Sequence, residues 1–109
     1  MQTFLNKMAF EFFSAEEVCS ELGQRIRAQR LLQEITQLDL AGRAGVSHGT
    51  VRNMEATGQA SMASFIRIVQ SLGLLGELEP LFVARIKTIA DMEKAQATPR
   101  QRAPRKLRP

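Results

Sequence analysis

The segment from Thr36 to Glu55, TQLDLAGRAGVSHGTVRNME, most constrains the fold because it predicts two short helices joined by a tight turn. Thr36 and Ser47 are of the residue types that cap the N-termini of helices. Gly45 lies between them and suits the left-handed residue that often ends a helix. The predicted helices span residues 37–44 and 48–55.

The second of these helices has two chemically different faces. Val51 and Met54 share one face at about 100° per residue, and that face is expected to be buried. The opposite face is polar, and arginine and asparagine side chains can bond the edges of guanine and adenine, while a glycine permits close approach. The candidate base-contacting residues are His48, Gly49, Arg52 and Asn53.

The order of residues from Leu22 to Phe82 resembles the phage-repressor and Cro-like (XRE-type) helix-turn-helix family. The matching elements are Arg30 at the end of the preceding helix, Thr36 with Gln37, Leu40 with Ala41, Gly45 to Ser47, Thr50 with Val51, and Glu55. The resemblance implies an all-α, five-helix lambda-repressor-like bundle. It also implies a repressor that binds double-stranded DNA as a homodimer on a palindromic operator.

The resemblance further implies roles for single residues. Gln37 is expected to brace the phosphate backbone of DNA, and Arg30 is expected to pair with Glu55 in a structural ion pair. Three hydroxyl side chains are further candidates for phosphate contact, although helix capping alone also explains two of them. These candidates are Ser47, Thr50 and Ser61.

Three further helices are predicted from caps and apolar spacing. Ser14 and Glu17 form a capping box for a helix over residues 15–32. A later helix begins at Ser61 or Ala63 and ends at Gly73, and a last one starts after Gly76 and continues toward Ala95, with Pro80 in its first turn. No segment is predicted to be a buried strand.

The 109 residues predict one small domain, residues 14–95, between two extensions. The first extension, residues 1–13, holds four of the six phenylalanines, Phe4, Phe10, Phe12 and Phe13. Two alternatives are open, because the rings either pack on their own domain or form a homodimer or partner interface. The alternation of Phe10 and Phe12 also allows an edge strand across a dimer axis.

The second extension, residues 96–109, accounts for the positive charge of the chain. The net charge is +4, yet residues 1–97 carry 10 Lys and Arg against 11 acidic residues, and residues 98–109 carry five cations and no acid. This tail is either a solvated segment or an arm that binds DNA phosphates. Its candidate contacts are Arg100, Arg102, Arg105, Lys106 and Arg108.

The sequence predicts a protein that is not an enzyme and needs no metal or cofactor. Cys19 is the one cysteine, which excludes a disulfide within the chain, and His48 is the one histidine. No carboxylate cluster, phosphate-binding loop or metal-ligand spacing is present. The lack of a signal sequence and of a run long enough to cross a bilayer predicts a cytoplasmic protein without a membrane partner.

Within the family, the run from Ser64 to Phe82 and the RQRAP tail are similar to the small HipB-like antitoxins. That similarity implies a HipA-like kinase toxin as a second partner. Two functions of different class therefore stay open. One is a transcriptional repressor, free-standing or an antitoxin, and the other is a protein–protein interaction module whose DNA face is weak or vestigial.

Overall fold

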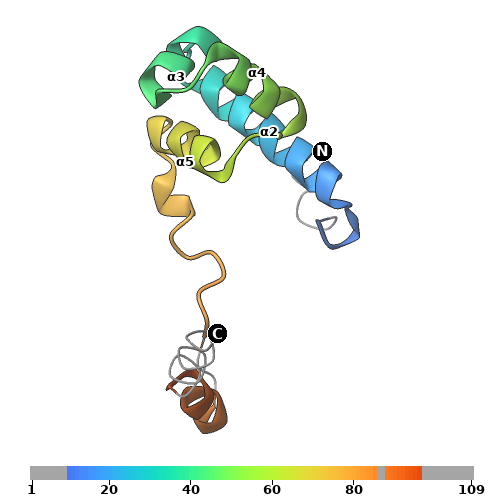
Figure 1. Cartoon of the computed structure of the whole chain (residues 1–109), viewed down its shortest axis with the longest axis vertical. Coiled ribbons are helices and arrows are strands. Elements are labelled where there is room, and N and C mark those ends of the chain that lie inside the picture. The colour runs from blue at the N-terminus through green and yellow to red at the C-terminus, as the bar shows by residue number, and fades with distance from the viewer. Residues whose placement is uncertain (1–9, 86–87, 97–109) are drawn as a thin grey trace, which may run out of the picture. The chain divides into compact units, whose positions relative to one another are not determined.

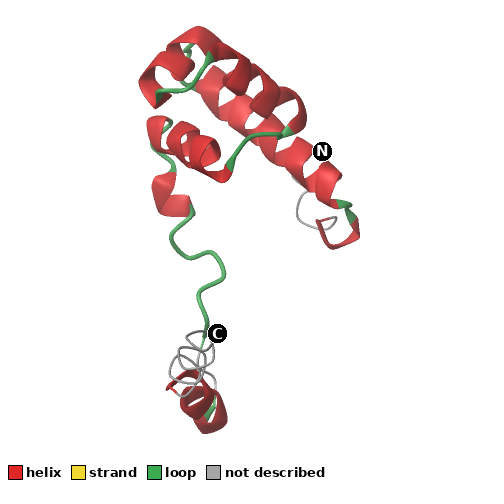
Figure 2. Ribbon diagram, viewed as in Figure 1, coloured by secondary structure: helices red, strands yellow, loops and turns green. Residues whose placement is uncertain are grey.

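The computed structural model describes residues 10–85 and 88–96, and all regular secondary structure in these ranges is helical (Figures 1 and 2). The chain divides into two compact units, Met1–Glu79 and Pro80–Pro109. The first unit contains η1 (Phe10–Phe12), α2 (Ala15–Leu32), α3 (Gln37–Ala44), α4 (His48–Thr57), α5 (Met62–Ser71) and η2 (Leu75–Glu77). The prediction of an all-α fold is confirmed for the described residues.

The ends of these helices follow the predicted capping residues. The Ser14 backbone N donates to Glu17 Oε1 at 2.8 Å, and Ser14 Oγ accepts from Glu17 N at 3.1 Å, which completes the capping box of α2. Thr36 and Ser47 cap α3 and α4 in the same way, through side-chain oxygens that accept backbone N–H bonds at 3.0 Å. Gly45 ends α3 with φ 72°. The turn between α3 and α4 is therefore fixed by local chemistry.

Two helix boundaries become definite in the structure. Helix α5 begins at Met62 rather than Ala63, because Ser61 Oγ accepts from the Ser64 backbone N at 3.1 Å. Helix α4 runs past Glu55 to Thr57 and ends at Gly58. The helix that carries the candidate base-contacting residues is thus about one half-turn longer than the sequence predicted.

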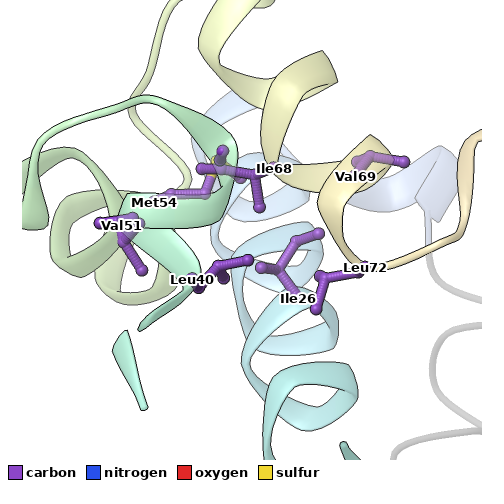
Figure 3. Close-up of a cluster of buried hydrophobic side chains, with 9 residues drawn as sticks. Ile26, Leu40, Val51, Met54, Ile68, Val69 and Leu72 are labelled. Carbon is purple, nitrogen blue, oxygen red and sulfur yellow. The ribbon is translucent and has the colours of Figure 1, made fainter. Parts of the chain in front are cut away.

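Nine buried side chains from α2, α3, α4 and the α5 region form one hydrophobic core (Figure 3). Ala41 of α3 is among them, and its side chain is only a methyl group. The largest fully buried residues are Leu40, Val51 and Ile68, one from each of α3, α4 and α5. Each of the three shorter helices therefore contributes an anchor to the same core.

Helices α2 and α4 touch backbone to backbone at two glycines. A Cβ atom at Gly23 would overlap the Met54 carbonyl oxygen and lie 3.2 Å from the Gly58 nitrogen. A Cβ at Gly58 would overlap the backbone of Cys19, and Gly58 also has φ 74°, in the left-handed region. No other residue type fits either position without moving one of the two helices.

The prediction of a single helix from Gly76 to Ala95 is wrong. After η2 the chain forms turns over residues 78–82, and a helix appears only at 89–96, within the second unit. Pro80 disfavours the helical conformation of the residue before it, and Phe82 has φ 57°. Val83 and Ile89, two of the apolar residues whose spacing suggested that helix, are exposed.

The phenylalanines that precede α2 are only partly described. Phe4 lies outside the described residues, and residues 10–12 form the 3-10 helix η1, so the edge-strand prediction for Phe10 and Phe12 is wrong. Phe10 packs on Phe13 with ring centroids 5.7 Å apart and lies under the Arg25 guanidinium, whose Cζ is 4.9 Å from its centroid. Phe12 is exposed. Phe10 thus packs within its own unit.

Two glycine substitutions are expected to have opposite effects on stability, one at the contact between α2 and α4 and one away from it. Gly23→Ala should lower the free energy of unfolding by about 3 kcal/mol, the upper part of the usual cost of overpacking, because the new methyl group meets backbone. Gly42→Ala, at an exposed position of α3 with open space around it, should instead raise stability by about 0.5–1 kcal/mol. Urea unfolding measures both, and equal effects would contradict the backbone contact.

Candidate nucleic-acid interface

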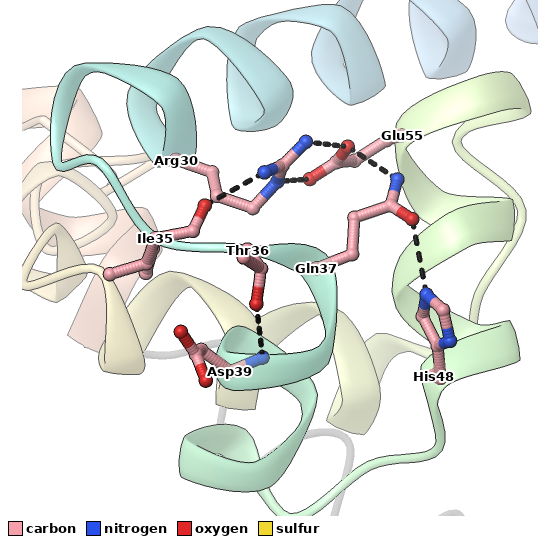
Figure 4. Close-up of polar contacts among 7 residues, drawn as sticks. All are labelled: Arg30, Ile35, Thr36, Gln37, Asp39, His48 and Glu55. Atoms are coloured by element: carbon pink, nitrogen blue, oxygen red, sulfur yellow. Dashed lines mark hydrogen bonds and ion pairs between the residues drawn. The ribbon is translucent and has the colours of Figure 1, made fainter.

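A buried ion pair fixes the position of α4. Arg30 Nε lies 2.6 Å from Glu55 Oε2 and Nη2 lies 3.1 Å from Oε1, while Nη1 donates to the Ile35 carbonyl at 2.8 Å (Figure 4). The two side chains are only 9% and 2% exposed. Two parallel bonds between a guanidinium and a carboxylate define both distance and orientation. The structure thus brings together the two residues that the family resemblance paired.

Gln37 continues this network from the interior to the surface. Its Nε2 donates to Glu55 Oε1 at 3.0 Å, and its Oε1 lies 3.2 Å from His48 Nε2. Because the amide oxygen only accepts, His48 donates through Nε2–H and keeps Nδ1 as an acceptor in the neutral imidazole. A hydrogen-bonded chain therefore joins the buried carboxylate to the first residue of α4.

The outward face of α4 carries the predicted base-contacting residues. His48, Arg52 and Asn53 are exposed, and Gly49 is half-buried. Arg52 Nη2 lies 3.8 Å from where a Cβ of Gly49 would stand, so the arginine side chain runs back along the helix over the glycine. Three polar side chains with different hydrogen-bonding patterns thus share one accessible surface.

The four predicted phosphate-contacting residues all make hydrogen bonds within the protein. The hydroxyl oxygens of Ser47 and Thr50 lie 2.8 Å apart, and Ser61 caps α5. Gln37 is half-buried and uses both ends of its amide, so what it can offer a phosphate is its second Nε2 hydrogen and its backbone N–H at the start of α3. The hydroxyls retain bonding capacity toward a ligand.

Arg27 and Gln24 are surface residues that sequence reasoning missed. They line a hollow of about 210 Å³ between α2 and α4 whose other walls include Gln37 and Arg52. Arg27 and Arg52 are both exposed, so two cations flank the hollow beside the outward face of α4. The one available signal was the spacing of Gln24 and Arg27, three residues apart and on one face of α2.

The described residues contain neither a metal-ligand cluster nor a membrane-spanning helix, and the basic tail lies outside them. Within residues 10–85 and 88–96, no group of three or more His, Cys, Asp or Glu side chains is placed to hold a metal ion. None of the helices described combines the length and the apolar character needed to cross a membrane. The five cations of the tail, Arg100 to Arg108, lie outside the described residues.

Comparisons of the chain with protein-family models, with curated proteins and with solved structures find no match. The hydrogen-bonded network and the outward face of α4 are therefore the features that bear on function.

Removal of the buried carboxylate of Glu55 is expected to lower the stability of the fold strongly. Glu55→Ala leaves the Arg30 guanidinium buried without its partner, which should lower the free energy of unfolding by about 3–5 kcal/mol. Glu21→Ala is the matched control, because it removes a carboxylate from a more exposed ion pair with Arg25 and should cost less than about 1 kcal/mol. Similar melting temperatures for the two variants would contradict the role of Glu55.

Proposed function

We propose that this protein is a sequence-specific transcription regulator, most simply a repressor, that binds double-stranded DNA as a homodimer on a palindromic operator. In this proposal residues 14–79 act as a lambda-repressor-like helix-turn-helix bundle. The observation that carries the proposal is the outward face of α4, where His48, Arg52 and Asn53 are exposed on a helix held by a buried ion pair. The protein would then act in the cytoplasm.

Each exposed side chain on α4 has a defined chemistry toward bases. The major groove of B-DNA admits an α-helix, and there a guanidinium bonds guanine O6 and N7 while an asparagine amide bonds adenine N6 and N7. His48 Nδ1, the acceptor left free by the bond from Nε2 to Gln37, suits the amino group of cytosine or adenine. Gly49 lets the backbone of α4 approach the base edges.

Phosphate contacts would come from the rim of this face. Arg27 beside Arg52, the hydroxyls of Ser47 and Thr50, and the backbone N–H of Gln37 are the candidates that lie nearest to α4. Residues 22–62 carry five arginines against three acids, a modest excess of positive charge. One subunit thus offers few contacts, which favours a dimer that places two α4 helices in major grooves about 34 Å apart.

The similarity to HipB-like antitoxins suggests a second partner, a HipA-like kinase toxin. Co-purification of a larger kinase-like chain with the untagged regulator would support this extension. Its absence would leave the free-standing repressor.

A protein–protein interaction module is the second candidate function. Leu81, Phe82 and Val83 favour it, because these three consecutive apolar residues are exposed, Phe82 at 95%. Exposed apolar runs of this kind commonly mark surfaces that another protein covers. In this case the polar face of α4 would be weak or vestigial.

Selection of bound fragments from a random DNA library at fixed salt tests the proposal. The wild type should enrich an inverted repeat, and the double variant Arg52→Ala/Asn53→Ala should lose it. Failure of the wild type to enrich any sequence would contradict the DNA-binding proposal and favour the interaction module.

Arg52 is expected to act as a base-contacting residue. Arg52→Ala should weaken binding to the selected operator by about 1–3 kcal/mol and relax the preference at one base pair. Arg67→Ala removes an exposed arginine from α5 and serves as the control for charge alone. Equal losses on operator and on random DNA would show that Arg52 contacts phosphate instead.

The basic tail is expected to bind phosphates without regard to sequence. Replacing Arg100, Arg102, Arg105, Lys106 and Arg108 by glutamine should weaken binding to all DNA sequences alike. It should also reduce the slope of log K against log salt by about 0.9 for each phosphate that the tail no longer neutralises. Titrations at several salt concentrations measure the slope. An unchanged slope would identify the tail as a solvated segment.

A further inference from the structure

An apolar trough runs along the side of α2 that faces α5. It consists of two adjacent hollows, of about 310 Å³ and about 210 Å³, which share Leu22 and Phe65 as lining residues. Ile26, Val69 and Leu78 help to line the larger hollow, and Cys19, Met54 and Met62 help to line the smaller one. We call these two hollows together the α2–α5 trough.

Apolar side chains in the trough are left open to solvent. Met62 is 74% exposed, and both shared residues, Leu22 and Phe65, are only half-buried. Moving a large apolar side chain from water into such a groove is favourable, because apolar surface is removed from water. The trough is therefore a favourable site for an apolar segment.

The chain itself approaches the rim of the trough at Phe10. The ring of Phe10 lies under Arg25, and Arg25 lines the larger hollow while Glu21 holds its guanidinium through a 3.1 Å bond. Residues 1–9 therefore connect to the first unit next to the trough. Nine residues can span up to about 30 Å when extended, whereas the part of α2 that lines the trough, from Cys19 to Gln29, is only about 15 Å long. Residues 1–9 are therefore long enough to reach both hollows.

The composition of residues 1–9, MQTFLNKMA, matches the trough. Four of the nine side chains are large and apolar, namely Met1, Phe4, Leu5 and Met8. The one charged side chain is Lys7, and the larger hollow has the exposed carboxylate of Glu77 on its wall. The segment and the groove thus match in apolar character, and Glu77 offers a partner to Lys7, since the Arg25 side chain on the same wall is already paired with Glu21.

We propose that residues 1–9 of this chain bind in the α2–α5 trough of the same molecule, with Lys7 near Glu77 and Phe4 in the smaller hollow. The segment then covers the apolar surface between α2 and α5. It leaves the outward face of α4 accessible, because the trough shares no lining residue with the hollow formed by Arg27 and Arg52. The proposal does not depend on DNA binding.

Tryptophan fluorescence of the full chain tests this docking, because the protein has neither tryptophan nor tyrosine. The indole introduced by Phe4→Trp should emit at shorter wavelength and be less quenched by acrylamide than that of Phe82→Trp. Phe82 is the matched control, since it is 95% exposed. Equal emission and quenching in the two variants would overturn the proposal.

A change in the trough should release the segment. Met62→Glu adds a carboxylate to the smaller hollow at the start of α5, where an acid suits the helix and circular dichroism should show unchanged helix content. Combined with Phe4→Trp, it should move the emission to that of the Phe82→Trp control. An unchanged emission in a folded double variant would place the indole elsewhere and overturn the proposal.

Dilution separates docking within one molecule from exchange between two copies. The blue-shifted emission of Phe4→Trp should persist at every protein concentration, since the segment and the trough belong to one chain. Loss of the shift on dilution, together with a change from dimer to monomer in sedimentation, would assign the segment to a second copy and overturn docking in its own molecule.

Discussion

The ion pair between Arg30 and Glu55 determines how three parts of the first unit meet. Arg30 belongs to α2, Glu55 to α4, and the same two side chains bond Ile35 in the connecting segment and Gln37 of α3. Burying two charges costs several kcal/mol each, and only a well-oriented and fully bonded arrangement offsets that cost. Among the described residues no buried side-chain nitrogen or oxygen lacks a partner. The network therefore admits one relative arrangement of α2, α3 and α4.

The local elements of the fold were predictable because they depend on neighbouring residues. Thr36 and Ser47 cap their helices by accepting hydrogen bonds from backbone N–H groups three residues away. Gly45 adopts the left-handed conformation because glycine has no Cβ atom. The prediction of the last helix was wrong because two residues interrupt its backbone. The apolar residues are spaced as in a helix, but Pro80 and the positive φ of Phe82 interrupt the helical backbone. The spacing of apolar residues does not reveal such an interruption.

The candidate site was predictable only as a face of one helix. Helical periodicity placed His48, Arg52 and Asn53 together on the exposed side of α4, as the structure has them. It could not show that Gln37 is bonded at both ends, or that Arg27 lies across a hollow from Arg52, because these neighbours come from separate helices. Tertiary packing, and not local pattern, determines such contacts.

The atoms that hold α4 against α2 at the two glycines are not the atoms that α4 exposes to solvent. Gly23 and Gly58 fix the approach of the two helices through main-chain atoms, which are the same whatever side chains α4 presents to solvent. Arg52 and Asn53 take no part in that support. Lineages of such a protein can therefore exchange the residues at these two positions through successive mutations while the scaffold is inherited unchanged, so the surface can diversify faster than the fold.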